Sequence, residues 1–246
     1  MRTLLLLGGM TPDVTKLYYD IINRAARSAL GGRHNAPLYM YSANLEDMVQ
    51  YAGAGDWDAF AKVYTNPIDA LSSKVDAVVV SAILAHKVTP QLTKALTSTG
   101  IPLLHIADCV ATHLKAQYPH VRTVGLLGPQ ITMLDRDDPD FFIGRLEAPE
   151  NGFKVVVPET QTDLEEVNRG MMNEVTKGAA AVTPQTKAMF IRQANKLIER
   201  GAQGIILGST DLGFVMHQED LADGVITIEP GAIHAEEAAK WALRKY

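Results

Sequence analysis

The chain alternates short apolar runs with longer amphipathic segments, and this alternation constrains its fold more than any other feature. Runs of four to six mostly apolar residues, bounded by Gly, Pro or Asp, predict buried parallel strands. They lie at Thr3–Leu7, Pro37–Tyr41, Ala77–Val80, Ile101–Ile106, Thr123–Leu127, Phe153–Val157, Gly204–Leu207 and Val225–Ile228. The segments between them carry apolar residues at helical spacing, as in Met189, Phe190, Ala194 and Leu197. We therefore predict an α/β fold with mainly parallel sheets and right-handed crossovers.

Short motifs recur about 120 residues apart, which indicates two related lobes, although generic repetition of strand and helix also produces such matches. The pairs are Leu6-Leu7-Gly8 with Leu126-Leu127-Gly128, Ala77–Ala82 with Gly204–Ser209, and Ile101–Ile106 with Val225–Pro230. We expect lobe one to comprise residues 1–115 and 222–246, and lobe two residues 116–221. Ligands bind at the carboxyl ends of parallel strands, so we expect residues 8–12, 81–86, 128–132 and 208–211 to face one another across a cleft.

Composition excludes several classes of protein. Hydrophobic residues make up 47% and charged residues 21%, which excludes a disordered or low-complexity chain. There are 23 basic and 28 acidic residues, and no basic run exceeds two, so nucleic acid is not an expected partner. No signal peptide or membrane span is expected. Cys109 is the only cysteine, which excludes an internal disulfide or a cysteine zinc site and favours the cytoplasm.

The segment Gly8-Gly9-Met10-Thr11-Pro12 is typical of a strand end that turns into a helix. Thr11 is suited to cap this helix, and Pro12 to occupy its first position. Free N–H groups at such a turn can hold an anion. The alternative is that the two glycines serve only close packing. The segment matches neither the dinucleotide-binding nor the phosphate-binding glycine motif, so no nucleotide cofactor is expected.

Seven short motifs spread along the chain belong together: Leu7-Gly8-Gly9-Met10, Leu17-Tyr18-Tyr19, Gly55-Asp56-Trp57-Asp58, His86-Lys87-Val88, Leu104-His105-Ile106-Ala107-Asp108, Leu207-Gly208-Ser209-Thr210-Asp211 and Ile233-His234-Ala235-Glu236. Through these motifs the chain resembles the aspartate/glutamate racemase family over nearly its whole length. The resemblance implies two pseudo-symmetric α/β lobes with an active-site cleft between them. It also implies cofactor-independent proton transfer next to the carboxylate of a small-molecule substrate, and a homodimer.

The chain departs from the family pattern at both acid/base positions. The family's Cys-Asn-Thr-Ala-His corresponds to Ala82-Ile83-Leu84-Ala85-His86, and its Gly-Cys-Thr-Glu corresponds to Gly208-Ser209-Thr210-Asp211. A thiol exchanges protons near neutrality, whereas a methyl group cannot, and a serine hydroxyl needs an adjacent base. The two-thiol mechanism is therefore excluded. Because Ile83 and Leu84 replace polar residues that help to hold the α-carboxylate, we expect a less polar substrate than aspartate or glutamate.

The resemblance also selects the candidate site residues. Thr132 and Thr210 match the family's carboxylate-contacting threonines. We expect the substrate to contact Gly9, Met10, Thr11, Ala82, Ile83, Leu84, Thr132 and Gly208, and we expect Ser209, Thr210, Asp211 and His86 to be catalytic. His86 has an alternative interpretation as a structural histidine that caps a helix, and Asp211 either orients Ser209 or caps the helix after it.

We weigh three hypotheses for function. The first is an enzyme that isomerises, decarboxylates or cyclises a relatively apolar carbonyl or carboxylate substrate, with Ser209 and Thr210 stabilising an enolate-like charge. The second is a non-catalytic ligand-binding protein. The third is a variant of a single-thiol racemase or decarboxylase in which serine replaces cysteine at position 209. Cys109 is expected to be a small buried hydrophobe, and the acidic segment 135–140 a surface turn or a lid, with no metal site.

Overall fold

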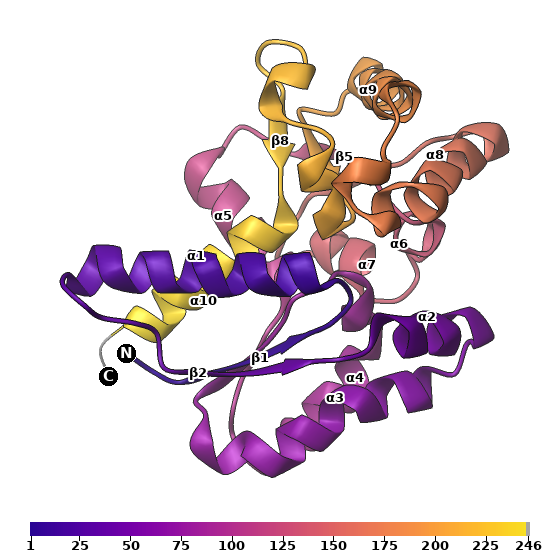
Figure 1. Ribbon diagram of the computed structural model, residues 1–246. Helices are drawn as coiled ribbons and strands as arrows, with labels where there is room; N and C mark the ends of the chain where they lie inside the picture. Colours follow the sequence, from indigo (N-terminus) through magenta and orange to yellow (C-terminus); the bar gives the residue numbers. More distant parts are fainter. Residues whose placement is uncertain (245–246) are drawn as a thin grey trace. The chain divides into compact units, whose positions relative to one another are not determined.

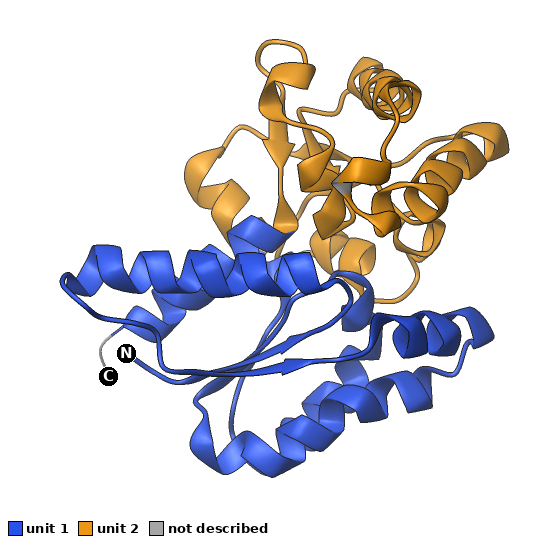
Figure 2. Cartoon of the chain, in the orientation of Figure 1, with its two compact units in different colours: residues 1–109, 231–246 blue, residues 110–230 orange. Residues whose placement is uncertain are grey.

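The computed structural model describes residues 1–244, which form two compact units (Figure 2). Unit 1 comprises Met1–Cys109 together with the chain from Gly231 onward, and unit 2 comprises Val110–Pro230. Each unit is an α/β layer structure with its own parallel sheet (Figure 1). The chain therefore leaves unit 1, builds unit 2 without interruption, and returns to unit 1 with its last helix.

The sheet of unit 1 has four parallel strands in the order β2-β1-β3-β4. Their bounds are β1 Leu4–Gly8, β2 Leu38–Ser42, β3 Ala77–Val80 and β4 Leu103–Leu104. The helices of this unit are α1 Pro12–Leu30, α2 Leu45–Ala54, α3 Trp57–Leu71, α4 Thr89–Leu96 and α10 Pro230–Leu243, with short 3-10 turns η1 Ser72–Lys74 and η2 Leu84–Val88. Helix α5, Ile106–Gln117, begins in unit 1 and continues into unit 2.

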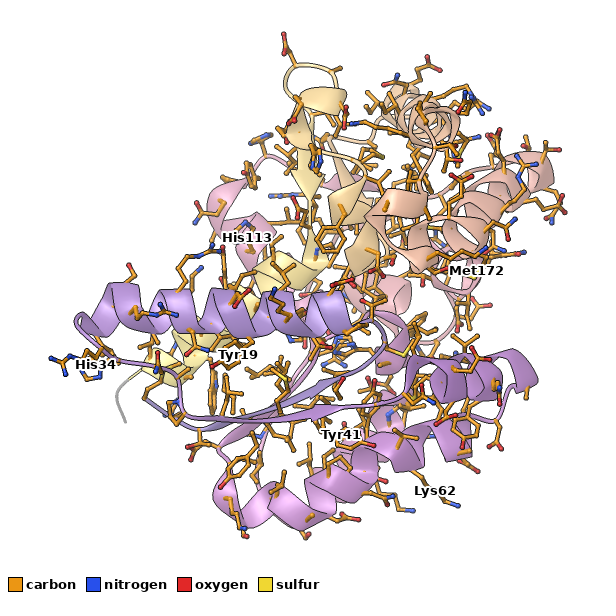
Figure 3. All side chains as sticks on the ribbon, viewed as in Figure 1. Tyr19, His34, Tyr41, Lys62, His113 and Met172 are labelled. Carbon is orange, nitrogen blue, oxygen red and sulfur yellow. The ribbon has the colours of Figure 1, made fainter. Side chains whose placement is uncertain are left out.

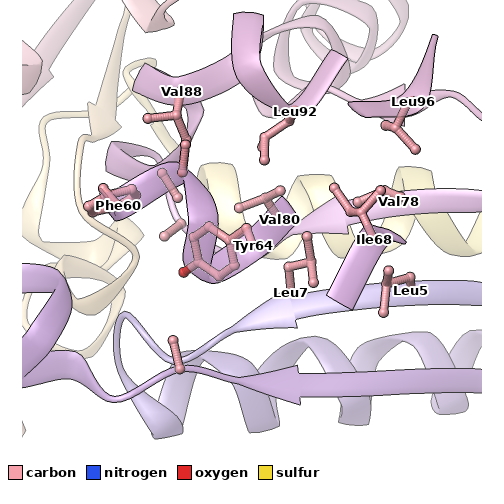
Figure 4. Packing of buried hydrophobic residues seen from close by; sticks show 14 of the residues in the cluster. Leu5, Leu7, Phe60, Tyr64, Ile68, Val78, Val80, Val88, Leu92 and Leu96 are labelled. Atoms are coloured by element: carbon pink, nitrogen blue, oxygen red, sulfur yellow. The ribbon is translucent and has the colours of Figure 1, made fainter. Parts of the chain in front are cut away.

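Both faces of this sheet are covered, which explains why its central strands read as uninterrupted apolar runs. Successive side chains of a strand point to opposite faces. Leu5 and Leu7 therefore join the cluster formed with α2, α3 and α4 (Figure 4), while Leu4 and Leu6 join the cluster formed with α1 and α10. All four leucines are fully buried. This burial fixes β1 in the middle of the unit.

The sheet of unit 2 repeats the arrangement, with parallel strands in the order β6-β5-β7-β8. Its strands are β5 Thr123–Leu127, β6 Lys154–Val156, β7 Gly204–Leu207 and β8 Ile226–Ile228. Its helices are α6 Gln130–Leu134, α7 Phe142–Glu147, α8 Gln161–Asn173 and α9 Pro184–Glu199, with 3-10 turns η3 Val175–Lys177, η4 Ala179–Ala181, η5 Thr210–Phe214 and η6 Gln218–Asp220.

The predicted fold class is confirmed, and a strand forms at each of the eight predicted positions, although β4 is only Leu103–Leu104 where Ile101–Ile106 was predicted, because Ile106 begins α5. The two sheets have the same order when β1 to β4 are matched with β5 to β8, as the sequence echoes indicate. The unit boundaries differ from the expected ones. Residues 222–230 group with unit 2, because β8 pairs with β7 through Gly204 and Ile226, and residues 110–115 of α5 also group with unit 2. Within residues 1–244, no helix is both long and apolar enough to span a bilayer.

Candidate functional site

In unit 1 the structure brings the ends of β1 and β3 together. The backbone N–H of Ser81 donates to the carbonyl of Leu7 at 2.9 Å, so the two parallel strands stop at the same edge of the sheet. The carbonyl of Gly8 then accepts from the backbone N–H of Ala43 at 3.1 Å and from the Tyr64 hydroxyl at 3.2 Å. Tyr64 is fully buried among the side chains of Figure 4, and burial raises its pKa. Its hydroxyl holds the backbone at the end of β1, a contact that the sequence analysis missed.

The turn after β1 is built for close packing. Gly9 has φ +99°, and a Cβ atom placed on it would lie 2.1 Å from the backbone nitrogen of Ala43, so no other residue fits. Its N–H donates to Oγ1 of Thr15 at 2.9 Å, and this hydroxyl donates to the carbonyl of Thr11, also at 2.9 Å. The N–H of Gly9 is therefore engaged within the protein and cannot also hold an anion. The structure therefore agrees with the alternative that the two glycines serve close packing.

The start of α1 differs from the prediction in one respect. Thr11 occupies the cap position with extended backbone, and Pro12 opens the helix as predicted. The Thr11 side chain, however, makes no capping hydrogen bond, so the prediction that it caps the helix is wrong. The turn is held instead by the Thr15 hydroxyl, which accepts from the Gly9 N–H and donates to the Thr11 carbonyl.

The end of β3 is occupied by apolar side chains that are mostly buried. Ala82 is 6% exposed and Ile83 is 3% exposed, while Leu84 is partly exposed and opens the turn η2. Methyl and aliphatic groups carry no exchangeable proton and accept no hydrogen bond. The structure thus retains the apolar character that the sequence predicted for this edge of unit 1.

His86 lies in the same turn and is completely buried. Its Nδ1 lies 2.8 Å from the carbonyl oxygen of Ala82, and its Nε2 lies 3.3 Å from the backbone N–H of Ile106, the first residue of α5. An N–H faces Nε2 and a carbonyl faces Nδ1, so the ring is neutral, with its proton on Nδ1. Both ring nitrogens therefore bond to the backbone, which agrees with the alternative that His86 is a structural histidine.

Two more buried histidines pack against His86. The ring centroids lie 4.4 Å from His105 and 5.8 Å from His234. His234 accepts the hydroxyl proton of Tyr18 at Nδ1 (3.0 Å) and donates from Nε2 to the carbonyl of Leu104 (2.8 Å). Burial lowers the pKa of His234 to about 3, with a further contribution from His86. His234 is therefore neutral near pH 7, and the cluster joins the ends of β3 and β4 to α1 and α10 of unit 1.

In unit 2 the ends of β5 and β7 meet in the same way. The N–H of Gly208 donates to the carbonyl of Leu127 at 2.6 Å. A Cβ atom on Gly128 would lie 2.8 Å from the backbone of Gly208, and one on Gly208 would lie 2.7 Å from the Leu127 carbonyl oxygen. Both glycines are needed because the two backbones approach so closely.

Directly after this contact, the chain turns through Ser209, Thr210 and Asp211, which are all partly buried. The Ser209 hydroxyl lies 3.4 Å from Oδ2 of Asp211 and accepts the backbone N–H of Asp211 at the same distance. Ser209 is the cap residue of η5, so the serine caps this turn and not the aspartate. Both bonds are long, which leaves the hydroxyl weakly held and free to bond more strongly elsewhere.

Thr132 lies on α6, which follows β5, the strand paired with β7. Its side chain is fully buried, and among the described residues its hydroxyl has no hydrogen-bond partner. The backbone of α6 is held firmly, since the N–H of Gln130 bonds to Asn168 of α8 at 2.9 Å. A buried hydroxyl without a partner costs free energy and calls for an explanation.

Glu229 is a further candidate that the sequence analysis missed. It follows β8, and a Cβ atom on Gly213 of η5 would lie 3.0 Å from its Oε2, so the carboxyl group lies next to the turn that begins at Ser209. Burial of the carboxyl group raises its pKa, while nearby His217 acts in the opposite direction. The motif at 225–230 repeats the motif at 101–106, and Glu229 then corresponds to His105. This correspondence could have identified Glu229 as a candidate from the sequence.

Cys109 and the acidic segment 135–140 lie outside these strand ends. Burial, with a smaller effect of Glu237 and Asp108, raises the pKa of the Cys109 thiol to about 12. Arg136 forms an ion pair with Glu147 and donates to the Val155 carbonyl, which ties the acidic segment to unit 2. Among residues 1–244, no group of three or more His, Cys, Asp or Glu side chains is arranged to hold a metal ion.

The structure therefore assembles the predicted residues in two sets. Unit 1 brings Gly9–Thr11 and Ala82–Leu84 to one sheet edge, and unit 2 brings Thr132 and Gly208–Asp211 to another. That these sets face one another across a cleft stays a prediction. Figure 3 shows the side chains on both units.

Two α/β units, each with a four-stranded parallel sheet and with small and hydroxyl residues at its strand ends, define the class as a two-lobed α/β protein. The model of the family described as Asp/Glu/Hydantoin racemase matches residues 7–238, so the chain belongs to this family. A candidate Asp/Glu racemase from Yersinia pestis has a similar structure, with 33% identity and a TM-score of 0.86 over 99% of this chain and all of that one. An aspartate racemase homologue from Pyrococcus horikoshii is 28% identical, with a TM-score of 0.79 over 99% of this chain and all of that one.

Proposed function

We propose that the protein is an enzyme that forms an enolate-like intermediate from a small carbonyl or carboxylate substrate, by isomerisation, decarboxylation or cyclisation. The substrate is less polar than aspartate or glutamate. The enzyme needs no cofactor, acts as a homodimer in the cytoplasm, and uses neither of the two thiols on which the family pattern relies. The proposal starts from the family to which the chain belongs, whose members act on small molecules. The absence of a thiol at Ala82 and Ser209 is the reason for proposing a different mechanism and substrate.

The observation that carries the proposal is the buried Thr132 hydroxyl without a partner. Thr132 follows β5, and the Ser209–Asp211 turn follows β7, the strand paired with β5. Its missing partner is an oxygen of the substrate. Thr132 holds this oxygen, and Thr210 and the turn's backbone donate to the negative charge that develops on it. Preorganised donors of this kind stabilise such charge more strongly than water does.

The bond that breaks lies next to the carbonyl of the substrate. In decarboxylation the C–C electron pair moves into the enolate, carbon dioxide leaves, and the enolate carbon then takes up a proton from water. In isomerisation the C–H pair moves into the enolate, and the proton passes to the Asp211 carboxylate through the Ser209 hydroxyl, which lies 3.4 Å from it, and returns by the same route to a different position of the substrate. In cyclisation the enolate carbon instead attacks a second carbonyl carbon of the same substrate, whose oxygen takes up the proton. His86 is assigned a positioning role, because both of its ring nitrogens are bonded to backbone.

Proton exchange in heavy water tests the proposal. Aspartate, glutamate and a panel of alkyl- and aryl-substituted malonates and 2-oxo acids are incubated with the protein and followed by NMR. We expect exchange or carbon dioxide release with a member of the apolar panel, and α-deuteration of aspartate and glutamate no faster than without protein. Thr132→Val keeps the shape of the side chain and removes the hydroxyl, so activity should fall about 10²–10³-fold.

Two outcomes separate the alternatives. Saturable binding without turnover of any carbon acid identifies the non-catalytic hypothesis, for which the inert Ala82 methyl is the supporting observation. A large gain of activity in Ser209→Cys supports the single-thiol hypothesis, since a thiol at this turn would act as the proton carrier. Rapid exchange of aspartate or glutamate by the unaltered protein would overturn the proposal.

A further inference from the structure

The sheet of unit 1 has an open edge, formed by β2. Among the described residues, no strand pairs with β2 on the side away from β1. Open edges are usually protected by lysine, proline or a bulge. Residues Leu38–Ser42 contain no charge and no proline, and Tyr39 and Met40 are 40% and 44% exposed. This edge therefore lacks the usual protection against strand pairing.

The backbone of β2 fixes which residues face outward. The N–H of Leu4 bonds to the Pro37 carbonyl, and the N–H of Ala43 bonds to the Gly8 carbonyl. Because backbone groups alternate between the two sides of a strand, residues 37, 39, 41 and 43 bond toward β1. Leu38, Met40 and Ser42 therefore direct their N–H and C=O groups away from the sheet.

We propose that β2 pairs with β2 of a second copy of this chain, antiparallel and centred on Met40, so that the two four-stranded sheets become continuous. In this register Met40 pairs with Met40 of the second copy through both of their backbone groups. Leu38 pairs with Ser42, again with outward groups on both sides. The strand Leu38-Tyr39-Met40-Tyr41-Ser42 is nearly symmetric about its centre, so each tyrosine meets a tyrosine across the pair.

The charges at the two ends of β2 select a second copy over other occupants. Arg33 is exposed five residues before the strand, and Asp47 is exposed five residues after it, in the first turn of α2. Two-fold antiparallel pairing brings the basic end of each copy to the acidic end of the other. Figure 3 shows His34 near the basic end and Tyr41 toward the opposite end of β2.

This inference deepens the homodimer part of the proposed function, and its test uses no substrate, so failure of the catalytic proposal leaves the result unchanged. The measurement is the mass of the full chain by sedimentation over a range of concentrations. We expect the mass of two chains, and in Met40→Lys, where two lysines would meet at the symmetry axis, at least tenfold weaker association. The control is Met172→Lys, since Met172 lies on α8 of unit 2 and is also 44% exposed (Figure 3).

Charge reversal tests the end contacts independently. Arg33→Asp and Asp47→Arg should each weaken association, and the double variant should restore it, because the two positions face one another twice in the dimer. Restoration distinguishes self-pairing from recognition of another protein by the same edge.

Cross-linking tests the register, and it remains informative if Met40→Lys does not fold. Met40→Cys should form a disulfide between chains on mild oxidation, because paired Cα atoms at this position lie about 5.5 Å apart, within the range for a disulfide. Met172→Cys is the matched control. A single-chain mass at every concentration, a dimer unaffected by Met40→Lys, or equal cross-linking of the two cysteine variants would each overturn the proposal.

Discussion

The Nδ1 atom of His86 lies 2.8 Å from the carbonyl oxygen of Ala82, so the imidazole bonds to the backbone of the residue that stands where the family pattern has a thiol. Together with the bond from the Ile106 N–H, this links the end of β3 to the start of α5. The histidine therefore shapes the strand end from within the core.

Replacement of His86 tests this structural role. His86→Phe leaves the Ala82 carbonyl and the Ile106 N–H without their partner, so we expect a loss of about 2–4 kcal/mol in the free energy of unfolding by urea. His34→Phe, at an exposed position, should change stability little. If His86→Phe unfolds like the unaltered protein but loses all turnover, the ring is an acid/base group and our assignment is wrong.

Acid should destabilise the protein through His234. Its pKa is about 3 when folded and near 6.5 when unfolded, so between these values the unfolded chain binds a proton that the folded chain does not. Stability therefore falls as the pH drops from about 6.5 toward 3, by at most about 1.4 kcal/mol per pH unit from this group. Urea unfolding across this range, compared between the unaltered protein and His234→Phe, measures the effect. If the free energy of unfolding falls equally with pH in the two proteins, His234 is not the cause of the acid destabilisation.

Alkylation of Cys109 should be slow and without effect on turnover. With a pKa of about 12, the thiolate is a very small fraction at pH 7.5, and the thiolate is the reactive form. Mass spectrometry after iodoacetamide treatment should show labelling in urea but little in the native protein. Fast native labelling with loss of activity would place the chemistry on this cysteine instead.

The hydroxyls of Ser209 and Thr210, which follow β7, should each contribute to turnover. Thr210→Ala removes a proposed donor to the developing charge, so kcat/KM on the substrate found in the exchange screen should fall about 10²–10³-fold. Ser209→Ala distinguishes a proton-relaying hydroxyl, which gives a large loss, from a purely geometric turn, which gives a small one. Thr97→Ala, at an exposed position in unit 1, is the control. Near-normal turnover in both Thr210→Ala and Ser209→Ala would contradict the assignment.

The strands could be predicted from the sequence because a strand buried on both faces is a continuous apolar run, as in Leu4–Leu7. It was less informative about the turns. Whether the Gly9 N–H is free depends on the Thr15 side chain six residues later, and no local pattern encodes that bond. The grouping of residues 222–230 depended on which sheet β8 joins, a choice made by pairing with Gly204.

Site residues were predictable to the extent that they follow a strand directly. Ser209–Asp211 and Ala82–Leu84 do so, and each set lies at the expected sheet edge. Tyr64 comes from the middle of α3 and reaches the Gly8 carbonyl only through packing, so its sequence position gives no sign of this contact. The apolar periodicity of α3 identifies Tyr64 as a core residue and does not reveal what its hydroxyl bonds.

The return of α10 to unit 1 sets an order for folding during synthesis. Ala235, Ala238 and Ala242 fill the face of the first sheet that α1 also covers, and the Ala242 carbonyl accepts the N–H of Arg2 at 2.8 Å. The ribosome makes α10 after all of unit 2, which is one unbroken stretch of chain. Unit 2 can thus be completed first, while the sheet face of unit 1 that α10 shares with α1 stays partly uncovered until α10 emerges.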